Sequence, residues 1–167
     1  IFADDPLYEY NKVNVRMIDY SDLKTRHFII LNELNTISSG LRDALFEFVQ
    51  NGGSVLLVPG LSIDAASLND FTQLFQGPGF SRVVEGETKV NRIDTEAPFF
   101  SNLFERVPKN MDLPKVLSYY QLNSRVTGKD RALMNLRNGD AFLSFVPHGM
   151  GNLYVSAVPL SAENNNF

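Results

Sequence analysis

The chain contains no cysteine among its 167 residues. This absence excludes disulfides, metal sites built on thiolates and catalysis by a cysteine nucleophile. Histidine is also scarce, since only His27 and His148 are present. The sequence therefore offers few of the side chains on which enzymes most often build acid–base or metal chemistry.

Excess positive charge and long apolar runs are missing too. The 15 Lys and Arg residues face 19 Asp and Glu residues, a net charge of −4, and no run of Lys or Arg occurs. A general nucleic-acid binder needs a basic surface, so we expect no nucleic-acid partner. No stretch approaches the roughly 18 apolar residues that cross a bilayer, so we expect no direct membrane insertion of this chain.

The length of the chain predicts one domain over residues 1–167. The chain begins with Ile1 and ends just after an apparent strand, so we expect it to be a piece of a longer protein. In that case the sheet face beside residues 153–158 should be partly open, with Leu153, Val155 or Leu160 exposed.

The stretch from Arg26 to Gly60 has the clearest pattern. Two short apolar runs, Phe28–Leu31 and Val55–Val58, flank an amphipathic segment from Ser38 to Asn51. This pattern predicts a βαβ unit with two parallel, buried strands, adjacent or nearly so. Ser38 suits the amino-terminal cap of the helix, and Gly52 suits the left-handed residue after its end.

The remaining elements are predicted from similar signals. A second helix is expected over 64–76, with Leu68, Phe71, Leu74 and Phe75 inward, before Gly77-Pro78-Gly79 ends it. Strands are expected at 13–17, 80–84, 88–93, 116–122, 132–136, 141–146 and 153–158. Asn138-Gly139 is a preferred hairpin turn, so the last third should be a meander.

Three short motifs carry a resemblance to a known family. They are Phe48-Val49-x-x-Gly52-Gly53, Asp94 to Phe100, and Gly149 to Val155 running into Pro159-Leu160-Ser161. With the βαβ pattern, they resemble the class I glutamine amidotransferase-like superfamily, and more narrowly its uncharacterised, membrane-anchored bacterial proteins. The resemblance implies an α/β, flavodoxin-like, mainly parallel sheet with helices on both faces and an antiparallel C-terminal meander. It also implies the extracytoplasmic (periplasmic) side of a bacterial membrane, with a cytoplasmic location left open.

The catalytic residues of that family are not matched. Active members place a cysteine on a strand-to-helix turn and a His-x-Glu pair after a later strand. Here the turn reads Pro59-Gly60-Leu61-Ser62, and the later position reads Val158 to Ser161. We therefore favour a non-catalytic binding or structural module of a larger protein, with the alternative of a hydrolase that uses Ser62 or Glu33.

The candidate binding site follows from sheet geometry. In open parallel sheets, ligands bind beyond the carboxyl ends of the strands. The polar or turn residues expected there are Asn32, Glu33, Asn35, Gly60, Leu61 and Ser62. Such loops are polar in most proteins, and a serine before a helix is usually a cap, so the structural interpretation stands beside the functional one.

No cofactor and no metal site are predicted. Asp4, Asp5, Asp19 and Asp22 match no ligand spacing, and His148 is expected in a solvent-facing turn. The expected partners are another protein or other domains of the same polypeptide, and an oligomer is possible.

Overall fold

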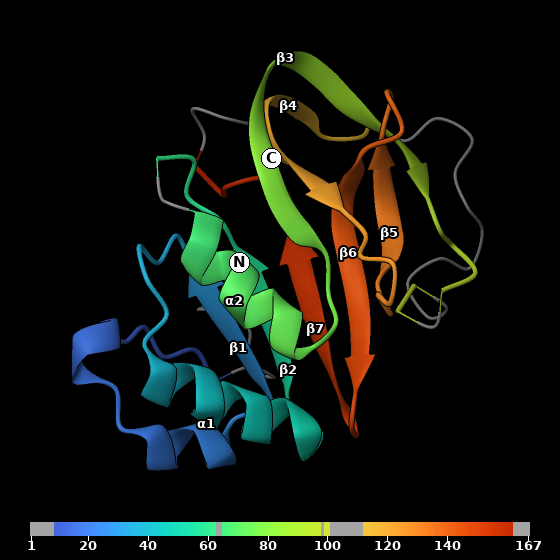
Figure 1. Cartoon of the computed structure of the whole chain (residues 1–167). Helices are drawn as coiled ribbons and strands as arrows, with labels where there is room; N and C mark the ends of the chain where they lie inside the picture. The colour runs from blue at the N-terminus through green and yellow to red at the C-terminus, as the bar shows by residue number, and fades with distance from the viewer. Residues whose placement is uncertain (1–8, 63–64, 98, 101–111, 162–167) are drawn as a thin grey trace.

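The computed structural model describes residues 9–62, 65–97, 99–100 and 112–161 (Figure 1). In these residues a seven-stranded sheet has the strand order β1-β2-β7-β6-β5-β3-β4. The strands are β1 (Phe28–Asn32), β2 (Ser54–Val58), β3 (Gly79–Ile93), β4 (Lys115–Asn123), β5 (Arg131–Leu136), β6 (Ala141–His148) and β7 (Gly151–Ser156). The α-helices are α1 (Ser39–Gln50) and α2 (Ala65–Leu74), and two short 3-10 helices are η1 (Val15–Met17) and η2 (Tyr20–Thr25).

The predicted βαβ unit is confirmed. β1 pairs with β2 in parallel, and β2 pairs in parallel with β7, so β2 lies in the middle of a three-stranded parallel block. Helix α1 begins after Ser38, whose side chain accepts a hydrogen bond from the Leu41 backbone N–H. Phe48 and Val49 are buried against the sheet, as expected from the helical spacing.

The other half of the sheet is antiparallel. β6 pairs with β7, β5 with β6, β3 with β5, and β4 with β3, all antiparallel. The two strands predicted over 80–84 and 88–93 form one strand, β3, with irregular pairing on both sides of residue 84 and a glycine, Gly86, at φ +127°. β3 and β4 therefore curve over the helical side of the sheet, and the Tyr120 N–H donates to the Ala157 carbonyl at 2.8 Å (Figure 1).

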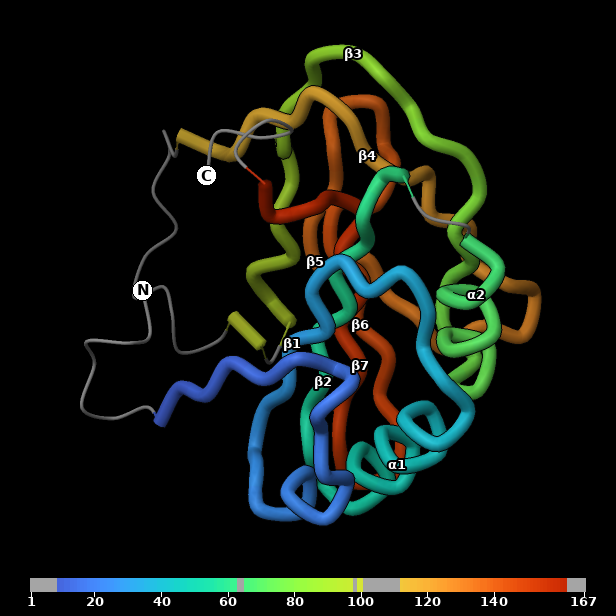
Figure 2. The backbone as a smooth tube through the Cα atoms, turned by 90° about the vertical axis from the view of Figure 1, so that its left-hand side faces the viewer, coloured from blue at the N-terminus to red at the C-terminus, as the bar shows by residue number. Residues whose placement is uncertain are grey.

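The fold class predicted from the sequence was wrong. The sheet is mixed and mostly antiparallel, not a flavodoxin-like, mainly parallel sheet with helices on both faces. α1 and α2 lie on one side of it (Figure 2). A parallel sheet needs a crossover segment for each added strand, and residues 112–161 hold hairpins instead, including the predicted Asn138-Gly139 turn with Gly139 at φ +92°.

The two faces of the sheet are packed unequally. On the helical side the inward side chains of the parallel strands are fully buried: Val55, Leu57, Leu153 and Val155. On the opposite side, the register places four apolar side chains in a row, and all four are only partly covered: Ile30, Leu56, Tyr154 and Phe145. Ala97, Phe100 and Leu133 form a second, small cluster on that side.

Several local predictions were also wrong. Residues 13–17 are not a strand, because Val15–Met17 is a 3-10 helix with exposed side chains. Leu153 and Val155 are buried rather than exposed, whereas Leu160 is exposed as expected. Leu74 in α2 is exposed, while its neighbours Leu68, Phe71 and Phe75 are buried as predicted. Asp64 and part of the expected aromatic turn over 98–104 lie outside the described residues.

Candidate functional site

The carboxyl ends of β1 and β2 bring two of the predicted site residues together. Glu33 follows β1, and its backbone N–H donates to the Val58 carbonyl at 3.0 Å. A β-carbon built on Gly60 would lie 3.4 Å from the Glu33 Cβ, so these residues are in close contact. Glu33 has φ +51°, a left-handed conformation that costs energy for a residue with a side chain.

The other predicted residues do not complete a site. Asn32, Asn35 and Ser62 are exposed, and Leu61 packs partly against the hydrophobic core. Within the described part of the chain, no side chain hydrogen-bonds to Ser62 or to the Glu33 carboxylate. Among the described residues, this end of the parallel strands thus brings a carboxylate and a glycine together but gives Ser62 no hydrogen-bonded base.

Both histidines lie at the opposite end of the parallel strands, where β1, β2 and β7 begin. His27 immediately precedes β1, and its carbonyl accepts a hydrogen bond from the Ser54 N–H. His148 is the last residue of β6 and pairs with Gly151, the first residue of β7. A five-residue strand separates these positions from Glu33 and Ser62, about 16 Å at the rise of an extended chain.

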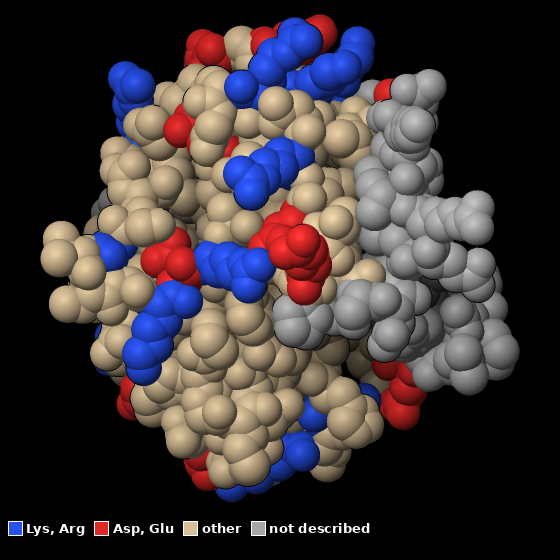
Figure 3. Space-filling view, turned by 90° about the vertical axis from the view of Figure 1, so that its right-hand side faces the viewer, with Lys and Arg blue, Asp and Glu red and all other residues tan. Residues whose placement is uncertain are grey.

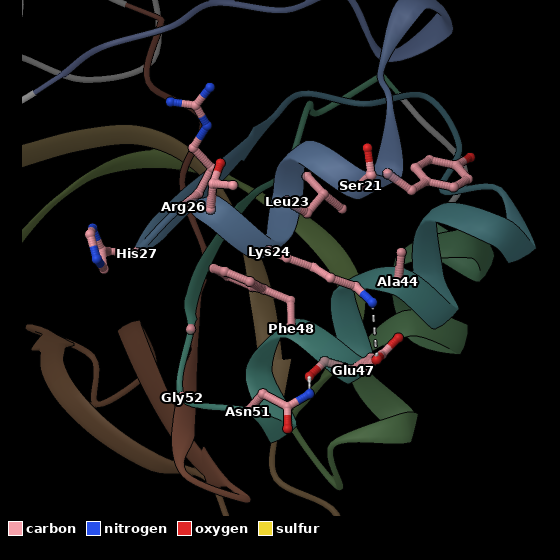
Figure 4. Close-up of a pocket in the computed structure, with 13 residues that line it drawn as sticks. Ser21, Leu23, Lys24, Arg26, His27, Ala44, Glu47, Phe48, Asn51 and Gly52 are labelled. Atoms are coloured by element: carbon pink, nitrogen blue, oxygen red, sulfur yellow. Dashed lines mark hydrogen bonds and ion pairs between the residues drawn. The ribbon is translucent and has the colours of Figure 1, made fainter.

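A cleft of about 790 Å³ also lies at this amino edge, between η2 and the last turns of α1. Figure 4 shows Lys24 and Glu47 meeting across it, with their charged atoms 3.6 Å apart. Arg26 and His27 belong to its rim and point away from that pair (Figure 4). Because Lys24 and Glu47 are largely exposed, water screens the pair, and the cleft holds no preorganised charge. This cleft was not predicted from the sequence, because no pattern there indicated η2.

The glycine motif behind the family resemblance has a packing role. A β-carbon on Gly53 would overlap the ring of Phe48. One on Gly151 would overlap the backbone carbonyl oxygens of Gly53 and Val49. The turn between β6 and β7 therefore packs directly against the end of α1, where the Met150 N–H donates to the Gln50 carbonyl at 3.1 Å.

His148 is held among aromatic rings, contrary to the prediction of a solvent-facing turn histidine. Its ring centroid lies 4.6 Å from that of Phe46 and 5.1 Å from that of Phe75. Its Nε2 atom is buried without a hydrogen-bond partner. Burial, with a smaller contribution from the Lys129 charge, lowers the pKa of His148, so the neutral form is favoured.

A polar network joins β4 to the β5–β6 hairpin. The Tyr119 hydroxyl donates to Asp140 Oδ2 at 2.7 Å and accepts from Asn138 Nδ2 at 2.7 Å, while Gln121 Nε2 donates to Asp140 Oδ1 at 3.2 Å. Burial and then the Asp140 bond raise the pKa of Tyr119. Burial acts to raise the pKa of Asp140 as well, but the hydrogen bonds it accepts outweigh burial and the pKa is lowered. The network has the character of a structural clamp.

Charge is mixed on the flank that Figure 3 draws, where Lys and Arg side chains alternate with Asp and Glu. Arg131 forms an ion pair with Asp94. Within the described residues, no group of three or more His, Asp or Glu side chains is arranged to hold a metal ion. The described helices include none with the length and hydrophobicity of a membrane span.

The fold and the site together define an α/β protein with a mixed sheet. No protein-family model and no curated protein sequence matches the chain. Among solved structures, it is similar to two cytoplasmic proteins from Salmonella typhimurium, with TM-scores of 0.63 and 0.61 at 17% and 18% identity. These alignments cover 86% and 85% of this chain but only 64% of each Salmonella chain.

Two further similar structures belong to proteins with other names, mmIFT52 and a beta-galactosidase. The N-terminal domain of mmIFT52 aligns with a TM-score of 0.60 at 13% identity, covering 84% of this chain and 69% of that one. A beta-galactosidase from Bacillus circulans aligns with a TM-score of 0.59 at 10% identity, covering 81% of this chain and 20% of the enzyme. None of these four structures is described as a glutamine amidotransferase. At such identities the likeness concerns the fold alone.

Proposed function

We propose that this chain is a non-catalytic, amidotransferase-like binding or structural module that acts through a protein partner or other domains of the same polypeptide. One observation carries the proposal. The two histidines of the sequence lie at the amino edge of the parallel strands, whereas Ser62 and Glu33 lie at the carboxyl edge. A nucleophile needs its base within hydrogen-bond reach, and the length of a strand separates Ser62 from both histidines here.

Ammonia release from glutamine tests the proposal directly. We expect no release by the purified protein, with or without an added acceptor, because the chain has no thiolate and no histidine near Ser62. The control is the Ser62→Ala variant, which should behave like the unsubstituted protein. Robust release that Ser62→Ala abolishes would overturn the non-catalytic proposal.

The left-handed backbone of Glu33 favours the alternative, a hydrolase with Glu33 at its site. Strain of this kind is often found at functional positions. Turnover of a panel of nitrophenyl esters and glycosides would reveal such an activity. Its loss in Glu33→Gln, but not in the matched variant Glu47→Gln at the opposite edge, would support the alternative.

We also propose a membrane-associated, extracytoplasmic location, which is the most specific part of the proposal. It depends on the family resemblance alone. Two of the similar structures are named as cytoplasmic proteins, which favours the cytoplasm as the competing location. Fractionation of cells that express the native gene separates the two. Recovery of the protein in the cytosolic fraction would remove the membrane-anchored part of the proposal.

A further inference from the structure

The outer edge of β1 has backbone groups that pair with no other strand of the described residues. The His27 carbonyl accepts a hydrogen bond from the Ser54 N–H, and the Glu33 N–H donates to the Val58 carbonyl. The backbone N–H and C=O groups of the odd-numbered residues in this segment therefore point toward β2. Backbone groups alternate in direction along a strand. Those of Phe28, Ile30 and Asn32 therefore point away from β2, and no described strand pairs with them.

The same edge exposes apolar side chains. Phe28 is 48% exposed and Ile30 is 36% exposed, on the face opposite the helices. Figure 2 looks onto this flank, where the segment that precedes η1 crosses in front of β1. Glu9 of that segment forms an ion pair with Arg26, two residues before the strand, at 3.2 Å. Natural edge strands are usually protected by a charge, a proline or a bulge, and β1 has none of these.

The opposite edge strand, β4, differs in each respect. It begins with Lys115, its pairing with β3 is interrupted by two irregularities, and the Tyr120 N–H is occupied by the Ala157 carbonyl. These are the usual means by which an edge is kept from pairing with another chain. The open edge is therefore a property of β1 in particular.

Charge on the β1 flank suits contact with an identical surface. Residues 9–33 carry four basic side chains (Lys12, Arg16, Lys24, Arg26) and four acidic ones (Glu9, Asp19, Asp22, Glu33). Their net charge is zero, although the whole chain carries −4. Two copies that meet through this segment thus bring together no excess of like charge from it.

We propose that β1 pairs antiparallel with β1 of a second copy of this chain, about a two-fold axis, to form one continuous sheet. This inference deepens the proposed protein-binding role by naming the partner. The pairing places Phe28 opposite Ile30 of the partner subunit, and Ile30 opposite Phe28 of the partner subunit. It adds about four backbone hydrogen bonds and two aromatic–β-branched cross-strand pairs, which are among the favourable pairings.

Sedimentation velocity over a range of protein concentrations tests the dimer. The unsubstituted chain should sediment with twice the mass of one chain. Ile30→Lys should weaken self-association by at least about tenfold, because it puts a charge on the edge. The matched control is Leu117→Lys on β4, where the native leucine is 45% exposed, and it should still dimerise. A monomer at all concentrations would overturn the proposal.

Disulfide trapping tests the register without relying on a disruptive substitution. Because the chain lacks cysteine, Phe28→Cys and Ile30→Cys can be made singly and then mixed under oxidation. Opposed residues of this kind have Cα atoms about 5.5 Å apart, within the range that a disulfide bridges. We expect covalent dimers in the mixture and few in either variant alone. Cross-linking only within the separate variants would overturn the proposed pairing.

The two proposals fail separately. A monomeric chain without glutaminase activity removes the dimer and leaves the non-catalytic role. A dimer that releases ammonia from glutamine removes the non-catalytic role and leaves the edge pairing.

Discussion

The two hairpins that share β6 are held in place by different means. The turn between β6 and β7 lies under the end of α1, where glycines let backbone touch backbone. The turn between β5 and β6 is tied to β4 by side-chain hydrogen bonds around Asp140. Close packing tolerates no added atom, whereas a polar network that loses one side chain keeps its other hydrogen bonds. The first hairpin should therefore respond to substitution more severely than the second.

The largest effect is expected for Gly151→Ala. The added methyl group would overlap the carbonyl oxygens of Gly53 and Val49, and backbone atoms cannot move aside as a flexible side chain can. We expect a loss of at least about 3 kcal/mol in the free energy of unfolding, measured by urea denaturation. The control is Gly86→Ala, where an added Cβ meets nothing within 4 Å and only the positive φ costs energy, about 1–2 kcal/mol. Equal losses in the two variants would contradict the close-packing argument.

A smaller effect is expected for Tyr119→Phe. This substitution removes the hydroxyl that bonds both Asp140 and Asn138 and leaves their polar atoms short of a partner. The expected loss is about 1–2 kcal/mol, again from urea denaturation. Tyr20→Phe is the matched control, because the exposed Tyr20 hydroxyl makes only a 3.4 Å contact with Ser38, and it should change stability by less than about 0.5 kcal/mol. If the two variants lose the same stability, the network does not hold the hairpin.

The smallest effect concerns His148 and pH. Burial lowers the pKa of this side chain in the folded state, so the unfolded state binds its proton more readily. Stability from His148 is therefore complete above the ordinary histidine pKa of about 6.5 and is lost as pH falls from there through the lower folded-state pKa. The loss should stay below about 1 kcal/mol, since the ring is partly exposed.

Chemical denaturation at pH 7.5 and pH 5.5 measures this pH dependence. The His148→Phe variant preserves a ring between Phe46 and Phe75 and removes the titrating group. The difference in stability between the two proteins should shift in favour of the variant at the lower pH. A difference that does not vary with pH would show that protonation of His148 is not linked to folding.

Local signals in the sequence were sufficient for much of the secondary structure. The capped helix after Ser38 and the Asn138-Gly139 hairpin follow from interactions between near neighbours. The parallel pairing of Phe28–Leu31 with Val55–Val58 follows from the single helix that joins them. The candidate site was predicted only in part. Glu33 and Gly60 meet because parallel strands end at a common edge, but spacing along the chain could not reveal that Ser62 would have no hydrogen-bonded base among the described residues.

The sequence by itself determined where the helices and most strands begin and end, because hydrophobic periodicity and capping act over a few residues. Only the tertiary structure decided that the sheet is mostly antiparallel with α1 and α2 on one side, that His148 lies between Phe46 and Phe75, and that β1 is an open edge. Each of these depends on contacts between segments far apart in the chain. Such contacts are chosen by shape and burial after the elements form, so no local pattern records them.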